Sequence, residues 1–195
     1  DVRSLGADFV SLSAHKIYGP KGIGALYVRR GVKLESMMSG GGHESGMRPG
    51  TLNVPAIAGF GRAAEMVCGN LDAYAAHYAE CRDMLEREIL KRHPSAVVRG
   101  AGVARIPNTL NISFPGFDGV KLASALDNAG IAVSTGSACS TDGISRVILA
   151  SGASMLEAAG TLRFSVGRGT TFSHIRRIVT ALDEILKKFK IDGVI

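Results

Sequence analysis

The sequence predicts a mixed α/β protein, because short apolar strands, amphipathic helices and an excess of glycine occur together. Short apolar or alternating segments are typical of strands, and apolar residues spaced three and four apart are typical of helices. Glycine accounts for 25 of 195 residues, about twice the usual share. With 46% hydrophobic and 21% charged residues, the chain has the composition of a folded protein with a substantial core.

The first 55 residues indicate the trailing edge of a larger α/β domain. Residues 7–12 form a short apolar run typical of a buried strand, and residues 25–28 form a second strand. The turn sequence Gly-Pro-Lys-Gly-Ile-Gly between them predicts that the second strand returns beside the first. Residues 39–55 are rich in glycine and lack periodicity, which predicts an irregular loop.

Two helices are predicted next. Apolar residues at helical spacing begin near residue 56 and continue to residue 93, with a break at residues 69–70. We expect residues 56–69 to be a connecting helix. The second helix is predicted to end before Pro94, and its apolar face consists of Tyr74, Tyr78, Cys81, Leu85 and Ile89.

Residues 70–195 predict a complete small α+β domain, in which helices pack on a small sheet. Alternating apolar and polar residues predict strands at 110–114 and 162–166, and a brief strand is expected at 131–133. This domain would contain the remaining helices of the chain.

Two of those helices have predicted caps. Asp118 is expected to begin a short helix that closes at Gly130, and Ser173 is expected to cap a long amphipathic helix near the C-terminus. The polar face of that long helix carries the densest basic cluster, Lys187, Lys188 and Lys190.

The formal net charge is +6, but the basic residues are dispersed, and we interpret the one cluster as a solvated helix face. We therefore expect no nucleic-acid partner. No apolar run approaches the roughly 20 residues that cross a bilayer. The first residues show no signal-peptide pattern, so a cytoplasmic protein without a membrane partner is expected.

The three cysteines, Cys68, Cys81 and Cys139, are widely separated and form no Cys-x-x-Cys pair. A disulfide framework and a resident metal site are therefore not expected, and a reducing compartment fits. Cys68 and Cys81 lie in apolar helical stretches, which predicts core positions. Cys139 lies among small polar residues in Ser-Thr-Gly-Ser-Ala-Cys-Ser-Thr, which predicts an exposed thiol.

Lys16 directly follows the first predicted strand, in the sequence Ser13-Ala14-His15-Lys16. Ligands of α/β sheets bind at strand ends, and a lysine partly withdrawn from water is a competent Schiff-base nucleophile. Ser13 and His15 are potential donors to a nearby phosphate. An ordinary surface lysine remains the alternative.

The glycine-rich sequence at residues 40–51 suits close approach of the backbone to a ligand, and Arg48 and Thr51 suit an anion. A flexible surface loop is the alternative. Arg163 alternates with Leu162 and Phe164, so it is predicted on the face opposite theirs. There it would clamp a carboxylate through two hydrogen bonds, unless it forms a structural ion pair.

Four ordered motifs carry a resemblance to a known family. S-A-H-K-I-Y-G-P-K-G-I-G, G-G-G-H-E-S-G-M-R-P-G-T, S-T-G-S-A-C and R-F-S-V-G-R closely resemble those of cysteine desulfurases of the class V aminotransferase superfamily. Among these, the chain is similar to the group with the longer cysteine loop, which serves iron–sulfur cluster assembly. The resemblance covers essentially the whole chain.

The resemblance implies a fold type I pyridoxal-phosphate-dependent transferase. Residues 1–55 would be the C-terminal part of the cofactor-binding large domain, and residues 70–195 the small domain with the cysteine loop. Lys16 would form the Schiff base with pyridoxal 5'-phosphate. The cofactor phosphate would be bound by Ser13, His15 and, from the partner subunit of a homodimer, Thr51.

The resemblance also implies the reaction. Arg163 would hold the carboxylate of L-cysteine, and Cys139 would take its sulfur as a persulfide while L-alanine is released. The persulfide would pass to a sulfur acceptor or iron–sulfur scaffold protein, and Cys139 is also a candidate transient iron–sulfur ligand.

Two other functions stay open at the level of sequence. A selenocysteine lyase, or another class V enzyme acting on an amino acid, would share the fold and much of the chemistry. A non-catalytic truncated module that dimerises or binds scaffold proteins would share the fold alone.

Overall fold

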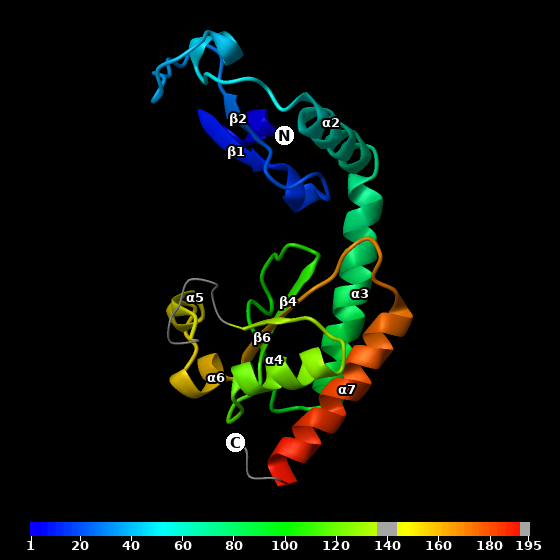
Figure 1. Cartoon of the computed structure of the whole chain (residues 1–195). Coiled ribbons are helices and arrows are strands. Elements are labelled where there is room, and N and C mark those ends of the chain that lie inside the picture. Colours follow the sequence, from blue (N-terminus) through cyan, green and yellow to red (C-terminus); the bar gives the residue numbers. More distant parts are fainter. Residues whose placement is uncertain (136–143, 192–195) are drawn as a thin grey trace. The chain divides into compact units, whose positions relative to one another are not determined.

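The computed structural model describes residues 1–135 and 144–191, and it divides the chain into two compact units, Asp1–Leu71 and Asp72–Ile195 (Figure 1). The elements of the first unit are α1 (Val2–Leu5), β1 (Phe9–Ser13), η1 (Ala14–Ile17), β2 (Gly24–Val28), η2 (His43–Gly46) and α2 (Val54–Cys68).

Strands β1 and β2 form an antiparallel pair, with Phe9 opposite Val28 and Ser13 opposite Gly24. The predicted return of the second strand is therefore confirmed. Gly24 allows the strands to approach closely, because a Cβ there would lie 2.6 Å from the carbonyl oxygen of Leu12.

Helix α2 begins at Val54, two residues before the predicted start, because Asn53 caps it. The Asn53 Oδ1 accepts a hydrogen bond from the Ala56 N–H at 3.2 Å, and a proline occupies the first turn, where its missing N–H costs nothing. The helix packs on the turn after η1, since a Cβ on Gly59 would lie 2.7 Å from Pro20 Cγ.

The second unit contains a four-stranded antiparallel sheet in the order β3-β4-β6-β5. Its elements are α3 (Leu71–Arg92), β3 (Val97–Val98), β4 (Thr109–Ser113), α4 (Gly119–Asn128), β5 (Ser134–Thr135), α5 (Arg146–Ala150), α6 (Met155–Ala159), β6 (Thr161–Ser165) and α7 (Phe172–Ile191).

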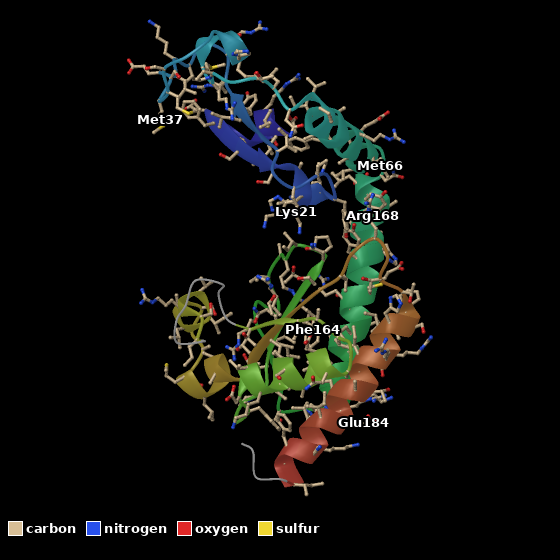
Figure 2. The ribbon with its side chains drawn as sticks, viewed as in Figure 1. Lys21, Met37, Met66, Phe164, Arg168 and Glu184 are labelled. Atoms are coloured by element: carbon tan, nitrogen blue, oxygen red, sulfur yellow. The ribbon has the colours of Figure 1, made fainter. Side chains whose placement is uncertain are left out.

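One face of this sheet carries the core. Leu110 and Ile112 of β4 lie opposite Phe164 and Leu162 of β6, and all four side chains are buried among residues of α3, α4 and α7 (Phe164 is labelled in Figure 2). The predicted alternation of β4 and β6 and the predicted amphipathic helices are therefore confirmed. The helical residues at the centre of the cluster are Cys81, Leu85, Ile89, Leu122, Leu126, Ile175, Val179, Leu182 and Leu186.

Three predictions are wrong in detail. No strand forms at residues 131–133, because the Ile131 N–H is still bonded to the Leu126 carbonyl at the end of α4, and pairing begins at Ser134. Ser173 does not cap α7; the Thr171 hydroxyl accepts from the His174 N–H at 3.3 Å and the helix begins at Phe172.

The third correction concerns Cys68, which is exposed near the end of α2, whereas Cys81 is buried as predicted. Burial, and next the charge of Glu80, raises the pKa of the Cys81 thiol. Across residues 1–135 and 144–191, no helix is both long and apolar enough to cross a membrane.

Candidate functional site

The turn that carries Lys16 is fixed through its neighbour Ala14. Strand β1 ends at Ser13, and the 3-10 turn η1 follows at once. Ala14 is fully buried, its N–H donates to the Ile23 carbonyl at 3.1 Å, and its carbonyl accepts from the Gly19 N–H at 2.9 Å. A Cβ on Gly19 would lie 3.0 Å from Ala14, so the turn is also tightly packed.

Three polar side chains project from this fixed backbone. Ser13, His15 and Lys16 are exposed, and none has a hydrogen-bond or ion-pair partner among the described residues. The exposure of Lys16 corrects the expectation that it is partly withdrawn from water. A hydroxyl and an imidazole suit a phosphate, and a primary amine suits an aldehyde, so the donor set fits pyridoxal phosphate.

The glycine-rich segment contains one more of the predicted site residues. It contains the short turn η2, in which Glu44 and Ser45 adopt left-handed backbone conformations with φ of 51° and 56°. Arg48 donates to the Pro49 carbonyl at 2.9 Å. Thr51 is exposed, and its hydroxyl has no partner in the described part of the chain, so it is available to an anion.

Arg163 lies on the face of the small sheet opposite the core, as predicted. It occupies the middle of a row across three strands, with Asn111 of β4 opposite it on one side and Ser134 of β5 on the other. Its Nη2 donates to Ser134 Oγ at 3.1 Å. No carboxylate of residues 1–135 or 144–191 pairs with it, which argues against a structural ion pair.

A second arginine approaches this face and is already neutralised. Arg99 Nη2 lies 2.9 Å from the Glu157 carboxylate, and Arg99 Nε donates to Ser113 Oγ at 3.0 Å. The Ser113 and Thr161 hydroxyls are 2.7 Å apart and share a hydrogen bond. These contacts occupy the polar groups of Arg99, Ser113 and Thr161. In the described part of this face, Arg163 is therefore the arginine that remains available to a ligand.

The loop after β6 is attached to α3. The Arg168 guanidinium carbon lies 5.8 Å from the centroid of the Tyr74 ring on this helix (Arg168 is labelled in Figure 2). His77 donates from Nε2 to the Thr170 carbonyl at 2.8 Å, and Gly167 N–H donates to the Thr170 hydroxyl at 2.9 Å. These contacts fix the backbone that continues from the Arg163 strand.

Cys139 lies outside the described residues. The structure describes the chain on both sides of it: β5, which pairs with Leu162 and Arg163, and α5, which begins at Arg146. The second unit therefore places Arg163 next to β5, whose residues Ser134 and Thr135 begin the sequence motif that ends at Cys139.

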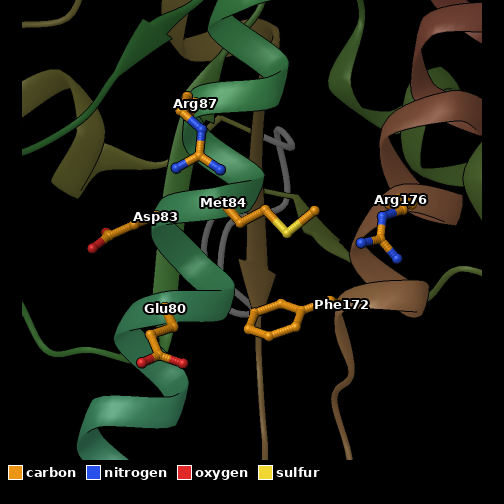
Figure 3. A pocket seen from close by; sticks show the side chains of 6 residues that line it. All are labelled: Glu80, Asp83, Met84, Arg87, Phe172 and Arg176. Atoms are coloured by element: carbon orange, nitrogen blue, oxygen red, sulfur yellow. The ribbon is translucent and has the colours of Figure 1, made fainter.

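A shallow open pocket lies elsewhere in the second unit, between α3 and the start of α7 (Figure 3). The Met84 side chain extends from α3 toward α7, and the Phe172 ring lies nearby. None of the predicted site residues lines it; its lining consists of Glu80, Asp83, Met84, Arg87, Phe172 and Arg176.

Sequence reasoning missed Asn111, Ser134 and the Arg99–Glu157 pair. A signal was present for the first, because Asn111 is a polar residue between Leu110 and Ile112 and so must face away from the core. The partners of Arg163 were not accessible, since the pairing of strands distant in sequence is not encoded locally.

The fold and the motifs agree with the class V aminotransferase family. The family profile described as Aminotransferase class-V matches residues 1–178, and the chain belongs to this family. Enzymes of this family and cysteine desulfurases are generally dependent on pyridoxal phosphate.

Curated relatives are similar in sequence over nearly the whole chain. The chain is 40% identical to cysteine desulfurase IscS 1 of Archaeoglobus fulgidus over 192 residues, which cover 97% of this chain and 50% of that protein. It is 38% identical to cysteine desulfurase IscS of Dictyoglomus turgidum, with 97% and 49% covered. The chain thus spans about half the length of the curated relatives it matches.

Solved structures give the same result. A NifS-like protein matches with a TM-score of 0.86 and 34% identity, covering 96% of this chain and 48% of that one. A NifS-like protein from Rickettsia africae matches with a TM-score of 0.86 and 33% identity, covering 96% and 49%. The predicted α/β fold and the predicted family are confirmed.

Proposed function

We propose that this chain is the C-terminal portion of a cysteine desulfurase, which removes sulfur from L-cysteine and gives L-alanine and a persulfide on Cys139. The observation that carries the proposal is the position of Arg163. It is an exposed arginine without a carboxylate partner in the described residues, and it pairs with Ser134, the first residue of the cysteine motif. Relatives named cysteine desulfurase, 40% identical over 97% of the chain, support the same reaction.

The cofactor of the proposed enzyme is pyridoxal phosphate. Lys16 would hold it covalently, and Ser13, His15 and Thr51 would donate to its phosphate; their polar atoms are exposed and unused, which supports this role. When bound, the cofactor supplies an electron sink that makes the hydrogen on the substrate Cα acidic. A homodimer, in which Thr51 serves the partner's cofactor, is part of the proposal.

The residues of this chain would then divide the work. Arg163 binds the substrate carboxylate through two N–H groups and fixes the orientation of Cα. Lys16 Nζ takes the proton from Cα and later returns a proton to the carbon skeleton. Both steps need an amine near the substrate Cα, and the turn η1 fixes the backbone from which Lys16 projects.

Sulfur transfer would fall to Cys139. Its thiolate attacks the substrate sulfur, a sulfur–sulfur bond forms and the carbon–sulfur bond breaks with its electron pair left on carbon, which takes a proton. Cysteine and one thiol thus yield alanine and one persulfide, with no external oxidant or reductant. Formation of the persulfide is reversible, so its outer sulfur can pass to a sulfur-acceptor or iron–sulfur scaffold protein. A reducing cytoplasm would suit this free cysteine.

The domain organisation belongs to the same proposal. Residues 1–55 would complete the large cofactor-binding domain, and residues 70–195 would form the small domain with the cysteine loop. Residues 56–69 would be the helix that connects the two domains. The division of the chain after Leu71 into two compact units is compatible with this organisation.

Replacement of Cys139 tests the sulfur step in the complete enzyme. Cys139→Ser should keep the visible absorbance of the bound cofactor and lose at least about 100-fold in alanine formation from L-cysteine. Cys68→Ser is the matched control, because Cys68 is exposed and outside the site, and it should keep normal turnover. Equal losses in the two variants would refute the assignment.

Replacement of Lys16 tests the cofactor anchor. After borohydride reduction and proteolysis, mass spectrometry should find the pyridoxyl group on Lys16, and Lys16→Ala should abolish the adduct. Lys21→Ala, at the next exposed lysine of the same turn region, should leave it unchanged. An adduct that persists in Lys16→Ala would place the anchor elsewhere.

A further inference from the structure

The open face of the small sheet contains two polar side chains that flank Arg163 and have no assigned role. Asn111 and Ser134 lie directly opposite it on the two neighbouring strands. Directly opposed residues have Cβ atoms about 4.5–5.5 Å apart, so the three side chains form one continuous polar row.

Ser134 restricts the guanidinium of Arg163. The arginine donates one N–H to Ser134 Oγ at 3.1 Å, and that oxygen still has its own hydrogen to donate. An arginine held at one nitrogen keeps its remaining N–H groups in a defined plane, which is what a bidentate carboxylate contact requires.

Asn111 carries a polar atom that the protein does not satisfy. Its Oδ1 is buried and has no hydrogen-bond partner in the described residues. A buried polar atom is normally paired, and a ligand or an ordered water at this point would satisfy it. The two ends of an amide are assigned from their partners, and either orientation would place an unpaired amide group beside Arg163.

The charges around the row indicate what kind of ligand it takes. Arg99 is neutralised by Glu157 at 2.9 Å, whereas no carboxylate of the described chain reaches Arg163. The row therefore combines one uncompensated cation with a hydroxyl and an amide, which matches a carboxylate that carries a neighbouring polar group.

We infer that Asn111 and Ser134 determine the specificity of carboxylate binding at Arg163: Asn111 contacts the bound amino acid, and Ser134 is a positioning residue that fixes the guanidinium. This inference rests on the proposed function for the identity of the substrate, an amino-acid carboxylate. It adds two residues to the site and explains why the amide of Asn111 lacks a partner in the protein.

Substitution of Asn111 by Asp is the sharpest test, because it changes one atom and supplies the carboxylate that Arg163 lacks. In the complete enzyme, Asn111→Asp should occupy the arginine internally and raise KM for L-cysteine at least about 100-fold. Thr109→Asp is the matched control, since Thr109 lies on the same strand and face but opposite Ser165. The rise in KM caused by Thr109→Asp should be at least about 10-fold smaller than the rise caused by Asn111→Asp.

Ser134 is tested separately. Ser134→Ala should raise KM about 3–10-fold with little change in kcat, because the guanidinium remains but loses its orientation. Ser134→Thr keeps the hydroxyl and should restore the normal KM. These variants also decide the question if Asn111→Asp fails to fold, and a loss of kcat alone that Thr does not rescue would overturn the role of Ser134.

A binding measurement separates this inference from the proposed reaction. L-Alanine carries the same carboxylate without sulfur, and its binding to the complete enzyme can be followed by calorimetry. Weakened binding in Asn111→Asp, with normal binding in Thr109→Asp, would support the row even if Cys139→Ser disproved sulfur transfer. Normal alanine affinity and normal KM in Asn111→Asp would overturn the inference while leaving the desulfurase proposal standing.

Discussion

Arg99 and Glu157 form an ion pair that is largely shielded from solvent. The guanidinium lies 2.9 Å from the carboxylate, and the two side chains are 13% and 25% exposed. Glu157 also closes a capping box with Ser154 at the start of α6. The pair therefore connects the helix that precedes β6 to the strand region around β3. Arg99 is paired with a carboxylate, whereas Arg163 has no carboxylate partner in the described chain, so its guanidinium is available to a ligand.

The first prediction concerns acid stability through Glu157. The Ser154 backbone N–H, and then Arg99, hold the pKa of this carboxyl below its usual value of 4.5. A carboxyl with a lowered pKa stabilises the fold above its usual pKa, and that stability is lost as the pH falls through the folded value. The urea midpoint of the wild type should therefore fall more steeply below about pH 4.5 than that of Glu157→Gln.

The control for this experiment is Glu184→Gln, an exposed glutamate of α7 (labelled in Figure 2). Its acid profile should match that of the wild type. Parallel profiles for the wild type and Glu157→Gln would contradict the prediction.

The second prediction concerns His93, which lies at the end of α3 with its Nε2 3.2 Å from Asp183 and its ring edge-on to Phe114. Burial lowers the pKa of His93, although Asp183 acts in the opposite direction. A histidine with a lowered pKa is neutral when folded, so stability is complete above its usual value of 6.5 and falls as the pH drops toward the folded pKa.

The thermal midpoint of the second unit should therefore fall between pH 7.5 and about pH 5.5, a range above that in which Asp183 titrates. His93→Gln should flatten this part of the profile, whereas His43→Gln, in the exposed glycine-rich loop, should not. A profile that rises toward acid in the wild type would show that the Asp183 charge dominates instead.

The third prediction concerns Gly160, which joins α6 to β6. A Cβ there would lie 2.1 Å from the Phe114 carbonyl oxygen and 2.8 Å from that of Phe117, and both atoms are backbone. Gly160→Ala should therefore destabilise the second unit by about 3 kcal/mol or more in urea unfolding. Gly169→Ala, where a Cβ meets nothing within 4 Å, should change stability by less than about 0.5 kcal/mol.

Particular residues show how far the sequence could predict this protein. The alternation around Leu110 and Leu162 was sufficient to place both strands and to turn Arg163 away from the core, because side-chain direction follows strand periodicity. The position of Lys16 at the end of β1 followed from an apolar run and the turn after it, although the predicted burial of that strand is wrong, because only Val10 of its five residues is not exposed. These features are local, and local patterns encode them.

Features that depend on distant partners were not predictable in the same way. Ile131 is apolar and resembles a strand residue, but its N–H remains bonded to the end of α4. Thr171 and Ser173 are both residue types that cap helices, and in the structure the Thr171 hydroxyl accepts from the His174 N–H. The row around Arg163 depends on strand register, which residue types alone do not fix.

The last prediction concerns the 195-residue chain on its own. The strands β1 and β2 expose apolar side chains, with Phe9, Leu12 and Leu26 exposed by 44%, 47% and 49%. Within the described residues neither strand has a second neighbour, so both outer edges offer unpaired backbone groups to another strand.

Apolar surface next to open strand edges favours pairing between copies, so the isolated chain should self-associate as its concentration rises. Sedimentation velocity should show species larger than a monomer, and Leu12→Lys should shift the distribution toward the monomer, because a charge on the strand opposes association. Val103→Lys, at a residue 66% exposed in a loop of the second unit, should leave the distribution unchanged. A wild-type chain that remains monomeric at all concentrations would show that these strand edges are protected, and a stronger effect of Val103→Lys would move the contact to the second unit.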